Sequence, residues 1–445
     1  MQTRRMRTRR PERIRGGPNR RTIVFHYGAA VDIPDATQTR LPSVGVAVDE
    51  LLAEVDARQS REPDVHGARL FGLVYPTGRD DLEDLIVAVN RRYLFGNALN
   101  PFKFPEIARF EGEVVAMTGG LVHLPQGGGG SMTSGGTESI LMSMLVNRER
   151  AAARGIERAE ILAPVSAHPA YAKAAHYFGM DLVRLPLDEH FRADVAAARE
   201  LVTPNTAVIV ASAFNYPYGV MDPVAELAAI ASERGIGCHV DGCIGGFVLP
   251  FMEALGYDVP PWDFRVEGVT EISADVHKYG YTAKGASVIL HRDADWFGHQ
   301  FFVYDQWGSG LYGSPGVAGA KPAAPIATAW AVMQSLGHAG YVEIMRDLMA
   351  TVAKVRATID GIEGIELVGD PIGPVLALRS DSIDLYAVAD VMDERGWHVN
   401  RNTDPYGLHL MLSPAHGLVV DQLINDLVDA VAHHGESRGK EARYS

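Results

Sequence analysis

The chain has few cysteines, no long apolar run and no overall excess of basic residues, and each shortage excludes a class of protein. Two cysteines, Cys238 and Cys243, occur among 445 residues, and apolar residues lie close to both. Two are too few for a disulfide framework, so we expect reduced thiols in the core of a cytoplasmic protein. No apolar stretch approaches the ~20 residues of a membrane-spanning helix, and no stable membrane anchor is therefore predicted.

The net charge of −14, from 41 basic and 55 acidic residues, disfavours nucleic acid and anionic membranes as partners. Residues 1–21 are the exception, with nine arginines and no apolar periodicity, and we expect a disordered basic tail there. No apolar run of signal-peptide length follows this tail. A hydrophobic content of 47% and a charged content of 22% are ordinary globular values.

The rest of the chain divides into three parts. Residues 22–104 contain a helical segment beginning at 48, an apolar stretch at 70–76 and an amphipathic helix at 80–93, but no core of their own. We expect an N-terminal arm packed on a neighbour or a second subunit. Residues 105–326 alternate apolar strands with helices, which indicates a mostly parallel sheet covered on both faces. Residues 327–445 predict a long helix, interrupted between Leu336 and Tyr341, and a small α+β domain with about three strands and two helices.

The rest of the chain is organised around residues 273–285. Runs at 269–272 and 286–290 flank this stretch and are predicted to be buried strands. A lysine at such a junction, Lys278, must lose its solvation or its proton, which is costly. That cost is acceptable for an amine nucleophile that forms a Schiff base. An ordinary loop lysine at the surface is the alternative.

Three further places carry polar groups at the ends of predicted elements. Residues 134–137, Ser-Gly-Gly-Thr, precede a helical run, where backbone N–H groups can face an anion. Turn glycines before helices are common, however, and the spacing of a P-loop is absent. Asp241 ends an apolar strand, where parallel sheets bind ligands, although it could instead cap a helix. His168 follows another strand and could equally be a structural loop histidine.

Taken together, these features match the parts of pyridoxal 5′-phosphate. The residues before the helix can hold the phosphate, and His168 can stack on the ring. Asp241 can keep the ring nitrogen protonated, and Lys278 can hold the aldehyde as an imine. The sequence therefore predicts this cofactor and no metal site.

The same motifs resemble the pyridoxal-phosphate-dependent group II decarboxylase family of fold type I and, within it, the sphingosine-1-phosphate lyases. The resemblance extends over residues 65–415. The Ser-Ala-Asp-x-His-Lys-Tyr-Gly run at 273–280 is specific, whereas the Gly-Thr-Glu run at 136–138 belongs to the wider family. The other resembling stretches are residues 133–142, 166–168, 173–180, 239–241, 245–247, 262–266, 279–281 and 312–315.

This resemblance implies an aspartate aminotransferase-like fold and a homodimer with active sites at the subunit interface. Lys278 would bind the cofactor covalently, Asp241 would pair with the ring nitrogen and His168 would stack on the ring. The remaining cofactor contacts would be Gly136, Thr137, Ser273, His277 and Gly319 of the partner subunit. The substrate would be contacted by Tyr75, Asn100, Lys284 and Lys321, of which Tyr75 and Lys284 also serve catalysis.

Two residues depart from the pattern of the lyases. Asn100 stands in place of a histidine, and an amide cannot take a proton. Lys321 stands in place of an arginine and offers a point charge instead of a bidentate fork. The resemblance implies retro-aldol cleavage of the C2–C3 bond of a phosphorylated long-chain base, which gives an aldehyde and phosphoethanolamine. The alternatives are α-decarboxylation of an amino acid and a catalytically idle binding protein.

Overall fold

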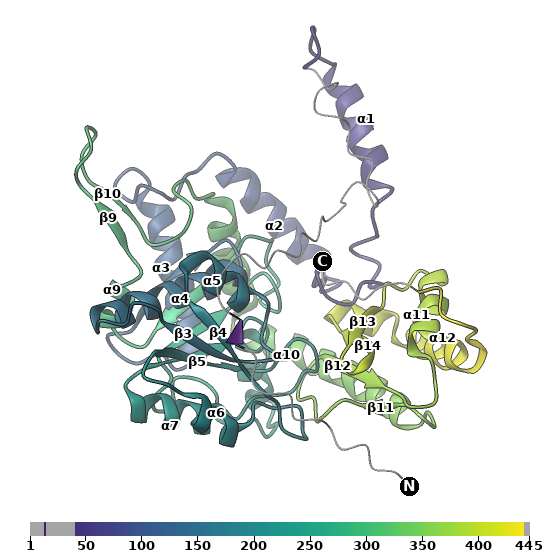
Figure 1. The fold of residues 1–445 in the computed structure, drawn as a ribbon. Helices are drawn as coiled ribbons and strands as arrows, with labels where there is room; N and C mark the ends of the chain where they lie inside the picture. The colour runs from purple at the N-terminus through teal and green to yellow at the C-terminus, as the bar shows by residue number, and fades with distance from the viewer. Residues whose placement is uncertain (1–12, 15–40, 440–445) are drawn as a thin grey trace.

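The computed structural model describes residues 13–14 and 41–439, and its centre is an eight-stranded sheet (Figure 1). The strand order is β1-β4-β3-β5-β6-β7-β8-β2, with the five strands from β4 to β7 parallel. Strand β8 runs antiparallel to β7 and β2, and β1 runs antiparallel to β4. The strands are β1 (Arg13–Ile14), β2 (Gly129–Thr133), β3 (Glu160–Pro164), β4 (Asp181–Leu185), β5 (Thr206–Ser212), β6 (Gly237–Asp241), β7 (Glu271–Ala274) and β8 (Ser287–His291).

Helices cover both faces of this sheet, as the apolar strands predicted. Strand β5 is buried along its whole length, so apolar side chains face both layers of helices. Helices α4 and α5 pack on one face, and α3, α6, α7 and α8 pack on the other. The bounds of these helices are α3 (Pro105–Leu121), α4 (Gly136–Ala153), α5 (Ala170–Phe178), α6 (Val195–Leu201), α7 (Val224–Arg234) and α8 (Leu249–Ala254). A short helix, α9 (Ala294–Gly298), follows β8.

A long helix, α10 (Ala324–Asp360), leads to the smaller C-terminal unit. It is interrupted at Gly337, whose φ of 55° is not helical, in agreement with the predicted break. The small unit has a four-stranded antiparallel sheet in the order β11-β12-β14-β13, one strand more than predicted. Its elements are β11 (Glu366–Leu367), β12 (Val375–Arg379), α11 (Leu385–Glu394), β13 (Asn400–Thr403), β14 (Tyr406–Met411) and α12 (Val420–His433). The polar strand β13 lacks the apolar alternation by which a strand is recognised in sequence.

The predicted disordered tail, residues 1–21, lies outside the described residues except for Arg13 and Ile14. These two residues form β1 and pair with Val183 and Leu182 of β4. The prediction of disorder is therefore wrong for this pair, which extends the edge of the sheet.

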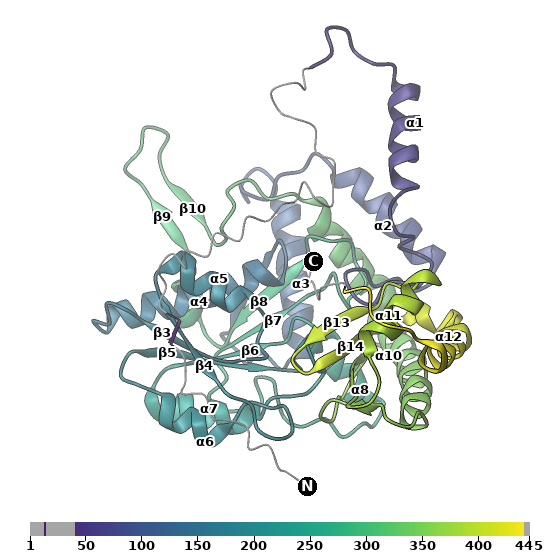
Figure 2. The same ribbon diagram turned by 45° about the vertical axis from the view of Figure 1, so that its right-hand side comes forward.

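Two segments project from the body of the molecule (Figure 2). Helix α1 (Val48–Gln59) has no buried residue, whereas α2 (Asp80–Tyr93) packs along α10. A hairpin of β9 (Phe302–Tyr304) and β10 (Tyr312–Ser314), which the sequence did not predict, has all three residues of β9 exposed. In the described part of the chain, no helix combines the length and the apolar character needed to cross a bilayer.

Candidate active site

Loops at the carboxyl ends of β3, β5, β6 and β7 converge with the start of α4 around a cavity of ≈ 370 Å³. This is the edge at which parallel sheets bind ligands. Seven of the predicted site residues line the cavity, namely Gly136, Thr137, His168, Asp241, His277, Lys278 and Lys284. Their positions after buried strands in the sequence thus correspond to one site in space.

The start of α4 forms a cradle that excludes side chains. A Cβ atom on Gly136 would lie 2.7 Å from Oδ2 of Asp275 and 2.8 Å from Sγ of Cys243, so glycine is required there. The cavity is lined by the first residues of this 18-residue helix, whose free N–H groups and positive dipole end favour an anion. The cradle therefore suits a phosphate group.

Asp241 and His168 both line the cavity, Asp241 at the end of β6 and His168 in the loop after β3. Oδ1 of Asp241, the last residue of β6, accepts a hydrogen bond from the backbone N–H of Cys243 at 3.1 Å. Nδ1 of His168 accepts one from the backbone N–H of Ala170 at 3.1 Å, so the neutral ring carries its proton on Nε2. Burial lowers the pKa of His168, against a smaller opposing effect of Asp241. The ring is therefore neutral at pH 7 and can stack on a flat ligand.

Lys278 reaches the cavity with its ammonium group bound to a buried carboxylate. Its Nζ lies 3.0 Å from Oδ2 of Asp275, whose side chain is 1% exposed. Nε2 of His277 lies 3.8 Å from the same oxygen. Burial alone would raise the pKa of Asp275, but the charge of Lys278, and that of His277 at the low pH where its ring is protonated, bring it below the ordinary value. Burial also lowers the pKa of His277, so its ring is neutral at pH 7.

Lys284 lines the cavity, and Tyr75, which does not line it, lies beside Lys284. Nζ of Lys284 lies 4.6 Å from the centre of the Tyr75 ring, within the range of a cation–π contact, and donates a hydrogen bond to the carbonyl of His277 at 3.3 Å. The side chain of Lys284 is partly exposed, but surrounding protein removes much of the water around its ammonium group. This desolvation, and to a smaller extent the charge of Lys278, lowers the pKa of Lys284 to about 8. Tyr75 packs edge-on against Tyr279, with the ring centres 5.1 Å apart.

Three other predicted site residues do not line the cavity. Ser273 is fully buried in β7, and its hydroxyl lies 3.3 Å from both Sγ of Cys243 and Nε2 of His239. Asn100 is exposed, and its Oδ1 accepts hydrogen bonds from the backbone N–H groups of two following residues at 3.0 Å. Gly319 lies in the loop after β10.

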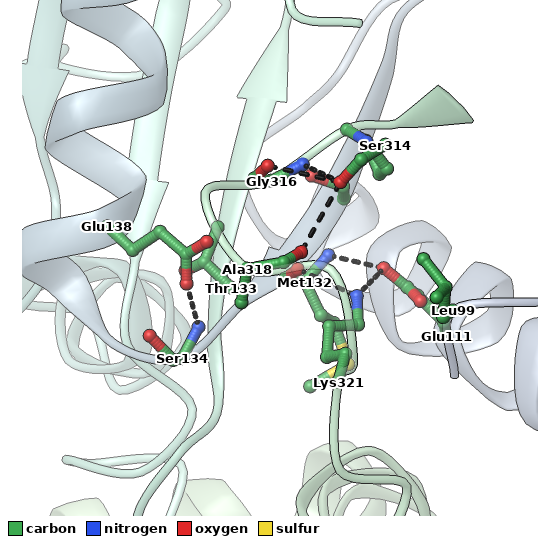
Figure 3. A network of polar contacts seen from close by, with 12 residues as sticks. Leu99, Glu111, Met132, Thr133, Ser134, Glu138, Ser314, Gly316, Ala318 and Lys321 are labelled. Atoms are coloured by element: carbon green, nitrogen blue, oxygen red, sulfur yellow. Dashed lines mark hydrogen bonds and ion pairs between the residues drawn. The ribbon is translucent and has the colours of Figure 1, made fainter. Parts of the chain in front are cut away.

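Lys321 also lies outside the cavity, in a loop that is firmly attached to the rest of the subunit (Figure 3). Its Nζ binds Oε1 of Glu111 at 2.7 Å and the carbonyl of Met132 at 3.0 Å. Next to this contact, Glu138 accepts hydrogen bonds from the backbone N–H groups of Ser134 at 2.7 Å and Val317 at 2.9 Å. Burial would raise the pKa of Glu138, but these bonds hold it below the ordinary value. Glu138 thus ties the loop to the cradle.

Sequence reasoning missed several residues that line the cavity. Asp275 sits in a loop between two strands, and nothing local signals its burial. Phe214, Asn215 and Tyr216 follow β5, where polar and aromatic residues directly after an apolar strand could have marked them as site residues. The ring of Tyr216 stacks on His409 of β14 at 4.4 Å, so the small unit supports this wall of the cavity.

Residues 95–380, more than half of the chain, match the conserved domain of the pyridoxal-dependent decarboxylases. The chain therefore belongs to the pyridoxal-dependent decarboxylase family. A structure of glutamate decarboxylase from Lactobacillus brevis matches with a TM-score of 0.79 over 91% of this chain and 96% of that one. At 21% identity this likeness shows the fold alone. The predicted fold type I architecture and dependence on pyridoxal phosphate are confirmed.

Within the family, the chain is similar to sphingosine-1-phosphate lyases. It is 40% identical to that of Oryza sativa subsp. japonica, over 88% of this chain and 74% of the relative. It is 39% identical to sphingosine-1-phosphate lyase 1 of Mus musculus, over 88% of this chain and 69% of the relative. A structure of sphingosine-1-phosphate lyase from Burkholderia pseudomallei has a TM-score of 0.86 and 39% identity, and the match covers 89% of this chain and 93% of that one. The resemblance drawn from the motifs is confirmed.

Proposed function

We propose that the protein cleaves the C2–C3 bond of a phosphorylated long-chain base, which gives an aldehyde and phosphoethanolamine. The observation that carries this proposal is the meeting of Lys278, Asp241, His168 and the start of α4 at one cavity, in a chain 40% identical to a sphingosine-1-phosphate lyase. The cavity fits pyridoxal phosphate, because the Gly136 cradle offers N–H groups to a phosphate and Lys278 supplies an amine. When bound, the cofactor supplies an aldehyde for that amine and an electron sink for the bond that breaks.

The proposed roles of the chain's own residues follow from their contacts. Lys278 holds the cofactor covalently, and Asp241 keeps a proton on the ring nitrogen by its negative charge. The neutral His168 covers the ring. Gly136 and Thr137 donate backbone N–H groups to the phosphate, with Ser273 and His277 supporting them from β7 and the loop that follows it.

Lys284 and Tyr75 are proposed to receive the substrate. A phosphate dianion that enters a partly apolar cleft needs charge-assisted donors, and Lys284 is cationic below its pKa of about 8. Lys321 would have to leave Glu111 to join them, because its ammonium is bound to that carboxylate. Asn100 could contact only the part of the substrate that extends beyond the cavity.

We also propose a cytoplasmic homodimer in which Gly319 of the partner subunit completes the phosphate site. Exposed apolar residues on the two projecting segments support this proposal. They are Leu51, Leu52 and Val55 on α1 and Phe302, Val303 and Trp307 in the hairpin. The division into an arm (22–104), a large cofactor domain (105–326) and a small domain (327–445) belongs to the same proposal. Light scattering on the purified protein measures the oligomeric state, and a monomer at working concentration contradicts this assembly.

A product assay tests the proposed reaction. The cofactor-loaded protein is incubated separately with a phosphorylated long-chain base and with glutamate or tryptophan, and aldehyde, phosphoethanolamine and carbon dioxide are measured. We expect aldehyde and phosphoethanolamine in equal amounts from the phosphorylated base. Carbon dioxide from an amino acid, with no aldehyde from the base, would show that the protein is an α-decarboxylase instead.

A further inference from the structure

Asp275 is a buried carboxylate that has no role in the proposed function. It follows β7 directly, and its side chain is 1% exposed. A carboxylate taken out of water is costly unless a cation pairs with it. The cation here is the ammonium group of Lys278, at 3.0 Å and three residues further along the chain.

The titratable groups that face this pair come from several elements around the cavity. They are His277 and Lys284 from the loop after β7, His168 from the loop after β3, Tyr216 from the segment after β5, Asp241 and Cys243 from β6 and its loop, and Glu138 from α4. Burial lowers the pKa of both histidines and raises that of the Cys243 thiol, so these three groups are uncharged at pH 7. Asp275 lies at ion-pair distance from the Lys278 ammonium.

We propose that Asp275 is a positioning residue that holds the Lys278 amine as an ammonium ion at the cavity wall and thereby sets the pH at which the cofactor is captured. Capture joins Nζ to the aldehyde carbon and releases one water molecule, and it requires the neutral amine. The ammonium must first give a proton to the solvent, and a carboxylate at 3.0 Å raises the pH at which it does so. This inference rests on the proposed covalent role of Lys278.

A second effect of the same carboxylate has to be separated from the first. Both oxygens of Asp275 lie against the cradle, within 2.9 Å of where a Cβ atom on Gly136 would be. The negative charge could therefore act on the cofactor phosphate rather than on the lysine. Pyridoxal separates the two effects, because it carries the aldehyde without the phosphate.

The experiment measures how fast cofactor-free protein captures pyridoxal and pyridoxal phosphate, by the rise of visible absorbance, between about pH 6 and pH 10, where lysine amines titrate. In Asp275→Asn the midpoint of the pH profile should fall by about 1–3 units with both probes. Capture at pH 7 should then be about tenfold faster or more, because one unit changes the neutral fraction tenfold. An unchanged midpoint with pyridoxal overturns the inference, whatever happens with pyridoxal phosphate.

Asp263→Asn is the matched control. Asp263 is also 1% exposed and paired with a cation, Arg265, at 2.9 Å, but it does not line the cavity. This variant should lose stability and keep the wild-type pH midpoint.

A second measurement does not depend on the folding of Asp275→Asn. An amine-reactive reagent is applied to the cofactor-free wild-type protein over the same pH range, and labelling of each lysine is read by mass spectrometry. Lys278 should become reactive at a higher pH than Lys284, whose pKa is about 8. The reverse order overturns the inference.

Failure of this inference can be told from failure of the proposed function. Lys278→Ala protein that still develops the visible band would refute the covalent role of Lys278 and the function with it. Loss of the band in Lys278→Ala, together with an unchanged midpoint in Asp275→Asn, refutes the inference alone.

Discussion

Replacing Asp241 by asparagine removes the charge proposed to keep the ring nitrogen protonated and changes little else. Asparagine has nearly the same volume, and its Oδ1 can still accept the hydrogen bond that Cys243 donates at 3.1 Å. The fold and the cradle at Gly136 should therefore be intact, and the cofactor should still bind. What is lost is one full negative charge in the wall of the cavity.

The size of the effect follows from that charge. Two unit charges ~4 Å apart attract by about 4 kcal/mol at an effective dielectric constant of ~20, before the cost of desolvation. Removal of one preorganised electrostatic contact in an active site typically costs ~10²–10³ in kcat. We therefore expect Asp241→Asn to lower kcat for aldehyde release by about 10² or more at saturating cofactor. Absorbance titration should show a visible band as in the wild type, and near-normal turnover would mean that another residue sets the protonation of the ring.

Three further predictions concern substrate handling and stability. If Lys284 binds the substrate phosphate as a cation, kcat/KM should fall above pH 8 because the ammonium loses its proton at about that pH. Lys284→Arg should remove this fall, and Lys284→Ala should raise KM below pH 8 without changing the cofactor spectrum. A kcat/KM that rises through pH 8 would instead identify Lys284 as a proton acceptor. Asn100→His, which restores the imidazole of the lyases, should preserve or improve cleavage of the phosphorylated base, and loss of cleavage would mark Asn100 as a determinant of a different specificity. Burial lowers the pKa of His409 and of His416 from 6.5 to about 4, so the unfolded chain takes up protons first. The free energy of unfolding should therefore fall by about 1.4 kcal/mol per pH unit for each histidine as the pH drops from 6.5 towards 4. Chemical denaturation at several pH values measures this, and a flat profile would show that the two rings have the same pKa in the folded and unfolded chains.

Local patterns predicted most of the elements of the fold. The expected amphipathic helix at 80–93 coincides with α2, because its apolar residues recur on one face of a helix. The predicted strands on either side of Lys278 form β7 (Glu271–Ala274), two residues later than expected, and β8 (Ser287–His291), because each is a short segment that is buried along its whole length.

Features that depend on distant partners were not predictable. Residues 127–130 are four consecutive glycines, and the last two begin β2. Glycine itself disfavours strands, so this strand depends on its pairing with β8, far along the chain. Lys321 looked like a substrate ligand, yet its ammonium is bound to Glu111, 210 residues earlier on α3. Asp275 carries no local sign of burial, although it is the residue bound to the reactive lysine.

Reductive trapping of the cofactor tests the account most directly. The loaded protein is treated with borohydride, digested, and searched by mass spectrometry for the peptide that carries the reduced cofactor. We predict loss of the visible band and the added mass on Lys278, with no trapping and no turnover in Lys278→Ala. Cofactor mass on Lys284 or Lys321, or a protein that takes up no cofactor at all, would contradict the assignment of this cavity and the reaction proposed for it.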